Sequence, residues 1–138
     1  MIRRGIVVVA VALAACSPGK REAASLVAAV DRYRRAEMGA KGPLADAIDA
    51  APCTDEEVCA AKTACVASAR PTARGAALKA EVEASLADLR AGKLTQDQAA
   101  SRDLPGKLDL AGRLLDEGHV KLSACDAQIT ALRLKYGL

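Results

Sequence analysis

Five cysteines are the residues of this 138-residue chain that are most able to do chemistry. Cys16 ends a short apolar stretch near the N-terminus, whereas Cys53, Cys59, Cys65 and Cys125 lie in an alanine-rich body. Five residues lie between Cys53 and Cys59, and five more lie between Cys59 and Cys65. These spacings are wider than the roughly two to four residues that usually lie between paired zinc ligands. The chain also lacks a Cys-x-x-Cys motif for thiol exchange or haem attachment. The spacing therefore predicts no metal site and no cofactor.

The first fifteen residues indicate a secretory signal. Arg3 and Arg4 form a basic start, and the ten residues at 6–15 are all apolar. A helix that crosses a bilayer needs about twenty apolar residues, so this run is too short to span a membrane by itself. A basic start followed by a short apolar run and small residues is the pattern of a cleaved signal. A short N-terminal helix of a cytosolic protein is the alternative.

The end of this stretch, Leu13-Ala14-Ala15-Cys16, resembles the lipobox of bacterial lipoproteins. The resemblance covers residues 1–17 and implies cleavage before Cys16, which would become an N-terminus lipidated with palmitate or related acyl chains. Two or more such chains anchor a protein stably, whereas a single chain binds marginally. Ser17 follows the lipid site. In the enteric sorting pattern a residue other than aspartate there implies the outer membrane, facing the periplasm, although other bacterial groups sort differently.

Export would place the four body cysteines in an oxidising compartment, where disulfides are the expected state. Cys59 and Cys65 are disfavoured as a pair, because a helix would separate their α-carbons by about 9 Å and turn them to different faces. Cys65 and Cys125 both fall on predicted core stripes, so we expect them to pair and to leave Cys53 for Cys59. The pairing of Cys53 with Cys65 and of Cys59 with Cys125 is the alternative.

The rest of the chain offers no recognisable set of catalytic residues. His119 is the only histidine, and its place on a predicted helix is typical of a surface residue. The sequence contains no Gly-x-Ser-x-Gly elbow, phosphate-binding loop or His-Glu-x-x-His pair. The carboxylates of Asp46, Asp49 and residues 55–57 fall near predicted helix starts, where negative charge is favoured, and lack the pattern of a calcium loop. We therefore expect a non-catalytic protein.

Composition predicts a small helical domain with a thin core. Removal of Arg3 and Arg4 with the signal leaves 18 basic residues against 17 acidic ones, so the mature chain has no general attraction to nucleic acid. Alanine makes up nearly a quarter of the chain, and the only aromatic residues are Tyr33 and Tyr136. Alanine favours helices but buries little area, so disulfides are expected to supply part of the stability.

Apolar residues at intervals of three and four predict three long helical arms. The first arm is expected over about 22–38, after a tether at residues 16–21, and a short helix over about 44–50 should follow it. The end of the first arm is basic, which is typical of a solvated helical face and alternatively of a surface that touches anionic headgroups. The residues responsible are Arg32, Arg34 and Arg35.

Capping and breaking residues predict where the second arm begins and ends. Thr54 and Glu57 form a capping box at its start, Pro71 should break or kink it, and Gly92 should end it. The third arm follows Pro105, and apolar or small residues recur in it at every step of three or four. This row of residues forms a heptad seam. The seam consists of Leu108, Ala111, Leu115, Gly118, Leu122, Cys125, Ile129, Leu132 and Tyr136.

The segment Leu94-Thr95-Gln96-Asp97-Gln98 resembles the Leu-Thr-x-x-Gln signature of a periplasmic family of helical stress chaperones and metal-resistance proteins. That family usually shows the motif twice, whereas this chain has it once. Thr95 and Gln98 also form an ordinary capping box for a short helix.

Together these features predict three regions. Residues 1–15 are a lipoprotein signal peptide, residues 16–21 a lipidated N-terminus with a short tether, and residues 22–138 a disulfide-stapled, all-α bundle of antiparallel arms. The expected function is a structural or interaction role in the cell envelope, with a membrane contact through Cys16 and a protein partner along a helical face. A periplasmic binding or chaperone-like module is the alternative.

Overall fold

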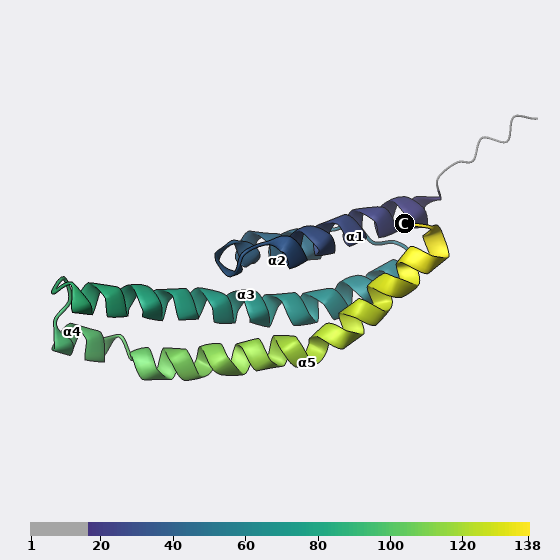
Figure 1. Cartoon of the computed structure of the whole chain (residues 1–138). Coiled ribbons are helices and arrows are strands. Elements are labelled where there is room, and N and C mark those ends of the chain that lie inside the picture. The colour runs from purple at the N-terminus through teal and green to yellow at the C-terminus, as the bar shows by residue number, and fades with distance from the viewer. Residues whose placement is uncertain (1–16) are drawn as a thin grey trace, which may run out of the picture.

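The computed structural model describes residues 17–138 and contains helices but no strand in this range (Figure 1). The elements in chain order are α1 (Pro18–Arg35), the short 3-10 helix η1 (Met38–Ala40), α2 (Lys41–Asp49), α3 (Glu56–Arg90), α4 (Gln96–Ser101) and α5 (Leu104–Tyr136). The predicted all-α class is therefore confirmed. Within the same range, no helix is both long enough and apolar enough to cross a membrane.

α3 and α5 run in opposite directions, whereas α1 runs parallel to α3, because α2 carries the chain back along the bundle between them (Figure 1). The predicted antiparallel arrangement of the three arms therefore holds for α3 and α5 but not for α1 and α3. The two longest helices, α3 with 35 residues and α5 with 33, make the most extensive contact in the molecule. α1 and α2 lie along only one half of this α3–α5 hairpin, the half that contains the C-terminus, and α4 lies at the opposite end. The three long arms are thus α1, α3 and α5, and α2 packs mainly against α3.

α1 begins earlier than the apolar pattern predicts. The Ser17 hydroxyl accepts a hydrogen bond from the backbone N–H of Lys20 at 3.3 Å and caps the helix. Pro18 occupies the first turn, where a helix leaves the backbone N–H without a partner in any case. Residues 18–21, which were expected in a tether, are therefore helical.

The cap of α3 lies one residue after the predicted one. The Asp55 carboxylate accepts hydrogen bonds from the backbone N–H groups of Glu57 at 3.0 Å and Val58 at 3.2 Å. Thr54 does not cap α3, because its backbone N–H and its hydroxyl both donate to Glu22 of α1. A tertiary contact has thus replaced the local capping box.

α3 runs through Pro71 without a break, so the predicted break is wrong. A proline inside a helix removes one hydrogen bond and crowds the carbonyl four residues back, at a cost of about 3 kcal/mol. Tertiary packing holds both sides of Pro71: Ala69 and Ala73 are buried, and the Tyr33 hydroxyl donates to the Ala69 carbonyl at 3.2 Å. Packing of an apolar face contributes most of the stability of a long helix and here overrides the local signal.

Small residues let α3 and α5 approach each other closely. A Cβ atom on Gly118 would lie 2.0 Å from Thr72 Oγ1 and 2.8 Å from the Ser68 carbonyl oxygen. A Cβ atom on Gly75 would lie 2.9 Å from the Ala111 carbonyl oxygen. The buried Ser68 hydroxyl donates to the Gly118 carbonyl at 2.8 Å, directly across this contact. Glycine at these two positions is therefore a packing requirement of the hairpin.

Buried apolar residues form two separate clusters. The main cluster lies between α1, α2, the N-terminal half of α3 and the C-terminal half of α5. A much smaller cluster near α4 contains only Val82, Leu94, Ala99 and Leu104, with Leu89 packed against it. The largest fully buried side chains all belong to the main cluster, and they are Leu26, Val30, Ile48, Val58, Cys65, Ile129 and Leu132.

The heptad seam of α5 is buried in part. Its buried members are Ala111, Gly118, Cys125, Ile129 and Leu132. Leu108 and Leu122 of the same seam are 50% and 39% exposed. The difference arises because α1 and α2 cover only part of the hairpin.

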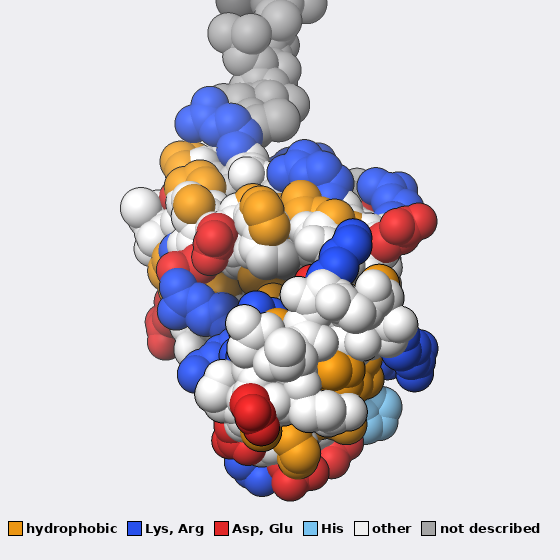
Figure 2. Space-filling view, turned by 90° about the vertical axis from the view of Figure 1, so that its left-hand side faces the viewer, with side chains coloured by type: hydrophobic (Ala, Val, Ile, Leu, Met, Phe, Trp, Pro, Cys, Tyr) orange, Lys and Arg blue, Asp and Glu red, His pale blue; other side chains and the backbone are white. Residues whose placement is uncertain are grey.

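Charged side chains of both signs surround the bundle when it is viewed along its axis from the α4 side (Figure 2). Hydrophobic side chains appear between them as separate patches on this view. The surface seen here matches the near balance of basic and acidic residues in the body of the chain.

Candidate anchoring site and disulfide-bonded end

The start of α1, the start of α3 and the end of α5 meet at one end of the bundle. A Cβ atom on Gly19 would lie 2.7 Å from the Tyr136 hydroxyl and 3.1 Å from the Asp55 carboxylate. The Tyr136 hydroxyl in turn donates to Asp55 at 3.3 Å. Cys16, the predicted lipidation site, lies outside the described residues, but it directly precedes Ser17, the cap of α1. Whatever is attached to Cys16 therefore connects to this end of the bundle.

Glu22 joins α1 to the N-terminus of α3. Its carboxylate accepts hydrogen bonds from the Thr54 backbone N–H at 2.7 Å, the Thr54 hydroxyl at 2.8 Å and the Asp55 backbone N–H at 3.1 Å. These donors stabilise the ionised form, so the pKa of Glu22 is lowered, mainly by the Thr54 backbone N–H and next by that of Asp55. The same bonds satisfy backbone groups of the segment that leads into α3.

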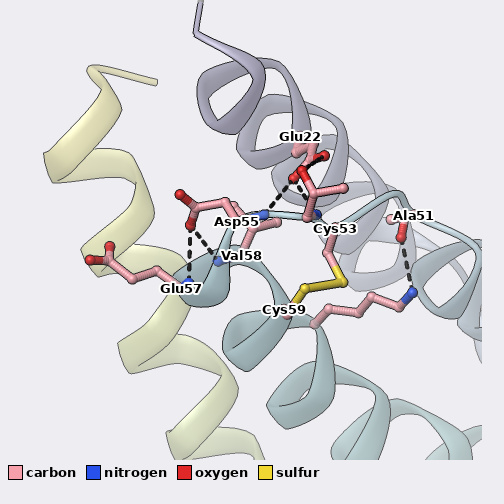
Figure 3. Close-up of a disulfide and its surroundings, with 9 residues drawn as sticks. Glu22, Ala51, Cys53, Asp55, Glu57, Val58 and Cys59 are labelled. Atoms are coloured by element: carbon pink, nitrogen blue, oxygen red, sulfur yellow. Dashed lines mark hydrogen bonds between the residues drawn. A yellow bond between two sulfur atoms is a disulfide. The ribbon is translucent and has the colours of Figure 1, made fainter.

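The Cys53–Cys59 disulfide fastens this leading segment to the first turns of α3 (Figure 3). Its two α-carbons lie 5.1 Å apart. Lys62, one turn further along α3, donates to the Ala51 carbonyl at 3.0 Å and so provides a second link between this segment and α3. The segment between α2 and α3 is thereby fixed at both ends.

The Cys65–Cys125 disulfide joins α3 to α5 inside the main core. Its α-carbons lie 4.5 Å apart, and the two residues are only 1% and 3% exposed. Cys65 and Cys125 come together because both lie on the buried stripes of their helices, as the helical-wheel argument proposed. The structure thus contains the pairing favoured from the sequence and not the alternative of Cys53 with Cys65 and Cys59 with Cys125.

The polar residues considered for catalysis or metal binding are dispersed. His119 is exposed on α5, as predicted. Asp49 forms an ion pair with Arg70 at 2.6 Å, and Arg34 forms one with Asp126. In the described range, no three histidine, cysteine or acidic residues lie close enough together to hold a metal ion.

Sequence reasoning missed a second apolar stripe on α5. It faces away from the core and includes Val120 and Leu134, which are 75% and 81% exposed. The stripe residues repeat at intervals of four and three, so at 100° per residue they lie within about 40° of one line. Drawing the full helical wheel of α5, and not only its buried seam, would have found them. The stripe consists of Val120, Ala124, Ala127, Ala131 and Leu134, all exposed.

Comparisons of the chain with protein-family models, with curated proteins and with solved structures found no match.

Proposed function

We propose that this chain is a lipid-anchored protein of the bacterial cell envelope, non-catalytic, that binds a helical segment of a partner protein along the outer face of α5. Anchoring through Cys16, at the periplasmic side of the outer membrane, rests on the lipobox-like Leu13-Ala14-Ala15-Cys16. The two disulfides support export, because such bonds persist in oxidising compartments. The partner-binding role rests on one observation, the exposed α5 stripe.

The α5 stripe has the geometry of an unpaired coiled-coil face. Apolar residues at alternating steps of four and three occupy the two core positions of a heptad. Its central residues are alanines, which would let a second helix approach closely, and Val120 and Leu134 would provide larger contacts on either side. An amphipathic helix that lays its apolar face on such a stripe is a common mode of protein recognition.

Charges beside the α5 stripe favour an acidic partner over a second copy of this chain. One flank carries Lys121, Gln128 and Lys135, and the other carries the uncharged Ser123 and Thr130. Two antiparallel copies would bring the basic flanks together, and two parallel copies would face them with uncharged residues. A partner with acidic flanking residues would pair with these lysines.

The lysines of this flank are available for exchange. Lys121 now pairs with Glu117 at 2.5 Å, and Lys135 pairs with Glu57 at 2.8 Å. Each of these ion pairs is exposed, and exposed pairs contribute only about 0–1 kcal/mol. A partner carboxylate can therefore replace the intramolecular one at little cost.

The proposal is tested by photocrosslinking in cells with a benzophenone amino acid at position 120, 127 or 134, and at Ala84 of α3 as an exposed control. We expect one defined partner to crosslink from the three stripe positions and not from the control. Crosslinking should be lost in Leu134→Asp and kept in Leu108→Asp, which changes an exposed leucine of α5 outside the stripe. Equal crosslinking from position 84, or equal effects of both aspartates, would refute the assignment of the stripe.

Anchoring is tested separately by the mass of the N-terminal peptide from envelope-purified protein. A diacylated or triacylated peptide beginning at Cys16 is expected, and Cys16→Ser should abolish it and release the protein from membranes. An unmodified peptide that still contains residues before Cys16 would rule out the lipid anchor, whatever the crosslinking shows.

The Leu-Thr-x-x-Gln segment gives no separate support to the alternative function, a chaperone-like module. Thr95 and Gln98 form a complete capping box at the start of α4, with the Thr95 hydroxyl accepting from Gln98 N at 3.2 Å and the Gln98 side chain accepting from Thr95 N at 2.9 Å. The helix cap accounts for both residues of the Leu-Thr-x-x-Gln segment without a further role.

A further inference from the structure

An open pocket of about 280 Å³ lies where the end of α1 and the start of α2 meet the middle of α3 and α5. This volume is just below the size range of small-molecule sites, which begins near 300 Å³. The lining of the pocket comes from four helices, so the pocket exists only in the assembled bundle. The lining residues are Tyr33, Arg34, Lys41, Ser68, Thr72, Leu115, Gly118, His119 and Leu122.

Lys41 is the feature of this pocket that calls for an explanation. It is only 9% exposed, and it is the one buried residue in the described range that carries a charge. Its ammonium donates to the Tyr33 carbonyl at 2.7 Å and lies 4.2 Å from the centre of the Tyr33 ring. No carboxylate of residues 17–138 lies within ion-pair distance of it. A buried lysine is normally paired with an anion, and burial lowers the pKa of this one.

The Tyr33 carbonyl explains part of the position of Lys41. This carbonyl is in the last turn of α1, where a lysine is favoured by the helix dipole, and it also accepts a hydrogen bond from the Ala36 backbone N–H at 3.3 Å. An ammonium has three N–H donors, and this bond uses one of them. The remaining donors lie at a pocket whose other charged or titratable lining residues are Tyr33, Arg34 and His119. No acidic residue lines the pocket.

A second groove on the bundle differs from this pocket, because both basic and acidic residues line it. It is lined by Lys62, Arg70 and Lys121 together with the acidic Asp49 and Glu117. Arg70 pairs with Asp49 at 2.6 Å, and Lys121 pairs with Glu117 at 2.5 Å. Of these two sites, the pocket at Lys41 is the one that combines a buried cation with a lining that lacks carboxylates.

The walls of the pocket are apolar around these cations. Leu115, Leu122 and the Tyr33 ring face it, and Leu122 is 39% exposed there instead of buried in the α5 seam. A void of about 20 Å³ adjoins the pocket, shares Tyr33 and Leu122 with it and extends toward the Cys65–Cys125 disulfide. The pocket thus offers an apolar surface beside a positive charge.

We propose that this pocket binds a small organic anion, a carboxylate with a short aliphatic or aromatic tail. The carboxylate would accept charge-assisted hydrogen bonds from the Lys41 ammonium. Arg34 also lines the pocket but already pairs with Asp126, so Lys41 is the cation that carries the proposal. The tail would lie on Leu115 and Leu122. This site is on the other side of α5 from the stripe that faces away from the core, and it depends neither on the lipid anchor nor on the helical partner.

The test uses hexanoate as the probe, with hexanol as an uncharged probe of similar shape and hexylamine as a cationic one. Binding is measured by NMR chemical-shift changes of the full chain, as matured by its host and held in phosphatidylcholine nanodiscs. Saturable shifts in the Tyr33 ring and in the Leu115 and Leu122 methyl groups are expected with hexanoate. Hexanol and hexylamine should bind at least about tenfold more weakly, as expected for loss of a charge-assisted hydrogen bond.

Lys41→Met and Lys62→Met form a matched pair of variants. Both lysines donate to a backbone carbonyl, Lys41 to Tyr33 and Lys62 to Ala51, but only Lys41 lines the proposed site. Lys41→Met should weaken hexanoate binding at least about tenfold, and Lys62→Met should leave it unchanged. Circular dichroism checks that each variant folds. The comparison of hexanoate with hexanol on the unmodified protein decides the question even if a variant does not fold.

Several results would overturn the proposal. Absence of saturable shifts with hexanoate would mean that Lys41 serves only to cap α1. Equal affinity for hexanoate and hexanol would mean that the pocket is a simple apolar cavity. Equal losses in Lys41→Met and Lys62→Met would mean that the effect is a general one on folding or charge.

Discussion

Replacement of Gly118 by alanine separates the effect of helix propensity from that of helix packing. Alanine is more favourable than glycine inside a helix by about 0.8–1.0 kcal/mol, so propensity alone predicts that Gly118→Ala stabilises the protein. The structure predicts the reverse. The new Cβ atom would meet Thr72 Oγ1 at 2.0 Å, the Ser68 carbonyl oxygen at 2.8 Å and the Thr72 backbone nitrogen at 3.1 Å.

The size of the effect follows from which of these atoms can move. The Thr72 hydroxyl can rotate, although it would lose its bond to the Ser68 carbonyl. The two backbone atoms can move only if α3 and α5 separate, which would also stretch the bond from the Ser68 hydroxyl to the Gly118 carbonyl. Overpacking of this kind costs about 1–3 kcal/mol and the lost bond about 1 kcal/mol. After the gain in propensity, we expect Gly118→Ala to lower the free energy of unfolding by about 1–3 kcal/mol.

Gly112→Ala is the matched control. Gly112 is an exposed glycine of the same helix, and a Cβ atom added to it meets nothing within 4 Å. This change should raise stability by about 0.5–1 kcal/mol. In thermal unfolding with both disulfides intact, about 4 °C per kcal/mol is expected, so the melting temperatures of the two variants should move in opposite directions. A Gly118→Ala protein as stable as Gly112→Ala would refute the close approach of α3 and α5.

Three further changes test other parts of the bundle. Removing the Cys65–Cys125 bridge with paired serines should cost about 4 kcal/mol on the loop-entropy model and removing Cys53–Cys59 about 2 kcal/mol, so denaturant midpoints that fall in the opposite order would contradict the model. Pro71→Ala should raise the free energy of unfolding by about 1–3 kcal/mol, because alanine restores a helix N–H and removes the clash of the ring, and an unchanged midpoint would show that α3 has already relaxed around the proline. The pKa of Glu22 is lowered in the fold, so its contribution is present above the ordinary pKa of a glutamate and is lost as the pH falls through the folded value. The melting temperature of the wild type should therefore decline more steeply than that of Glu22→Gln when the pH is lowered below about 4.5, and parallel curves would exclude the Glu22 contacts.

The sequence was most informative where one periodic pattern determined one structural feature. The buried stripes of α3 and α5 placed Cys65 opposite Cys125, and the capping box at Thr95 marked the start of α4. The same reasoning failed at Thr54 and Pro71, because contacts from α1 outweighed local preferences there. Thr54 donates to Glu22, and Tyr33 binds the carbonyl of Ala69 beside the proline.

The pocket at Lys41 illustrates what a local pattern cannot predict. Lys41 looks like an ordinary lysine near a predicted helix start, and nothing nearby in the sequence indicates that it is buried. Its surroundings come from Tyr33, Thr72 and Leu122, which only the folded bundle brings together. The α5 stripe is different, because its spacing is visible in the sequence, although the buried seam on the other face of the helix is the more regular pattern.

Most of the stabilising contacts lie in the same half of the bundle as the proposed anchor and the end of the proposed partner site. Both disulfides, the Glu22 bonds and the main core lie in the half of the bundle where α1 begins, whereas the half near α4 has only the small cluster around Val82. Helical geometry gives the α5 stripe, from Val120 to Leu134, a length of about 21 Å, and its far end is near the C-terminal end of α5, where Tyr136 meets the start of α1. A lipid on Cys16 would therefore hold the stripe close to the membrane. The end of the stripe lies in the half of the molecule that contains both disulfides and the main core. A partner helix bound there would meet a surface that is already ordered, which limits the entropy lost on binding.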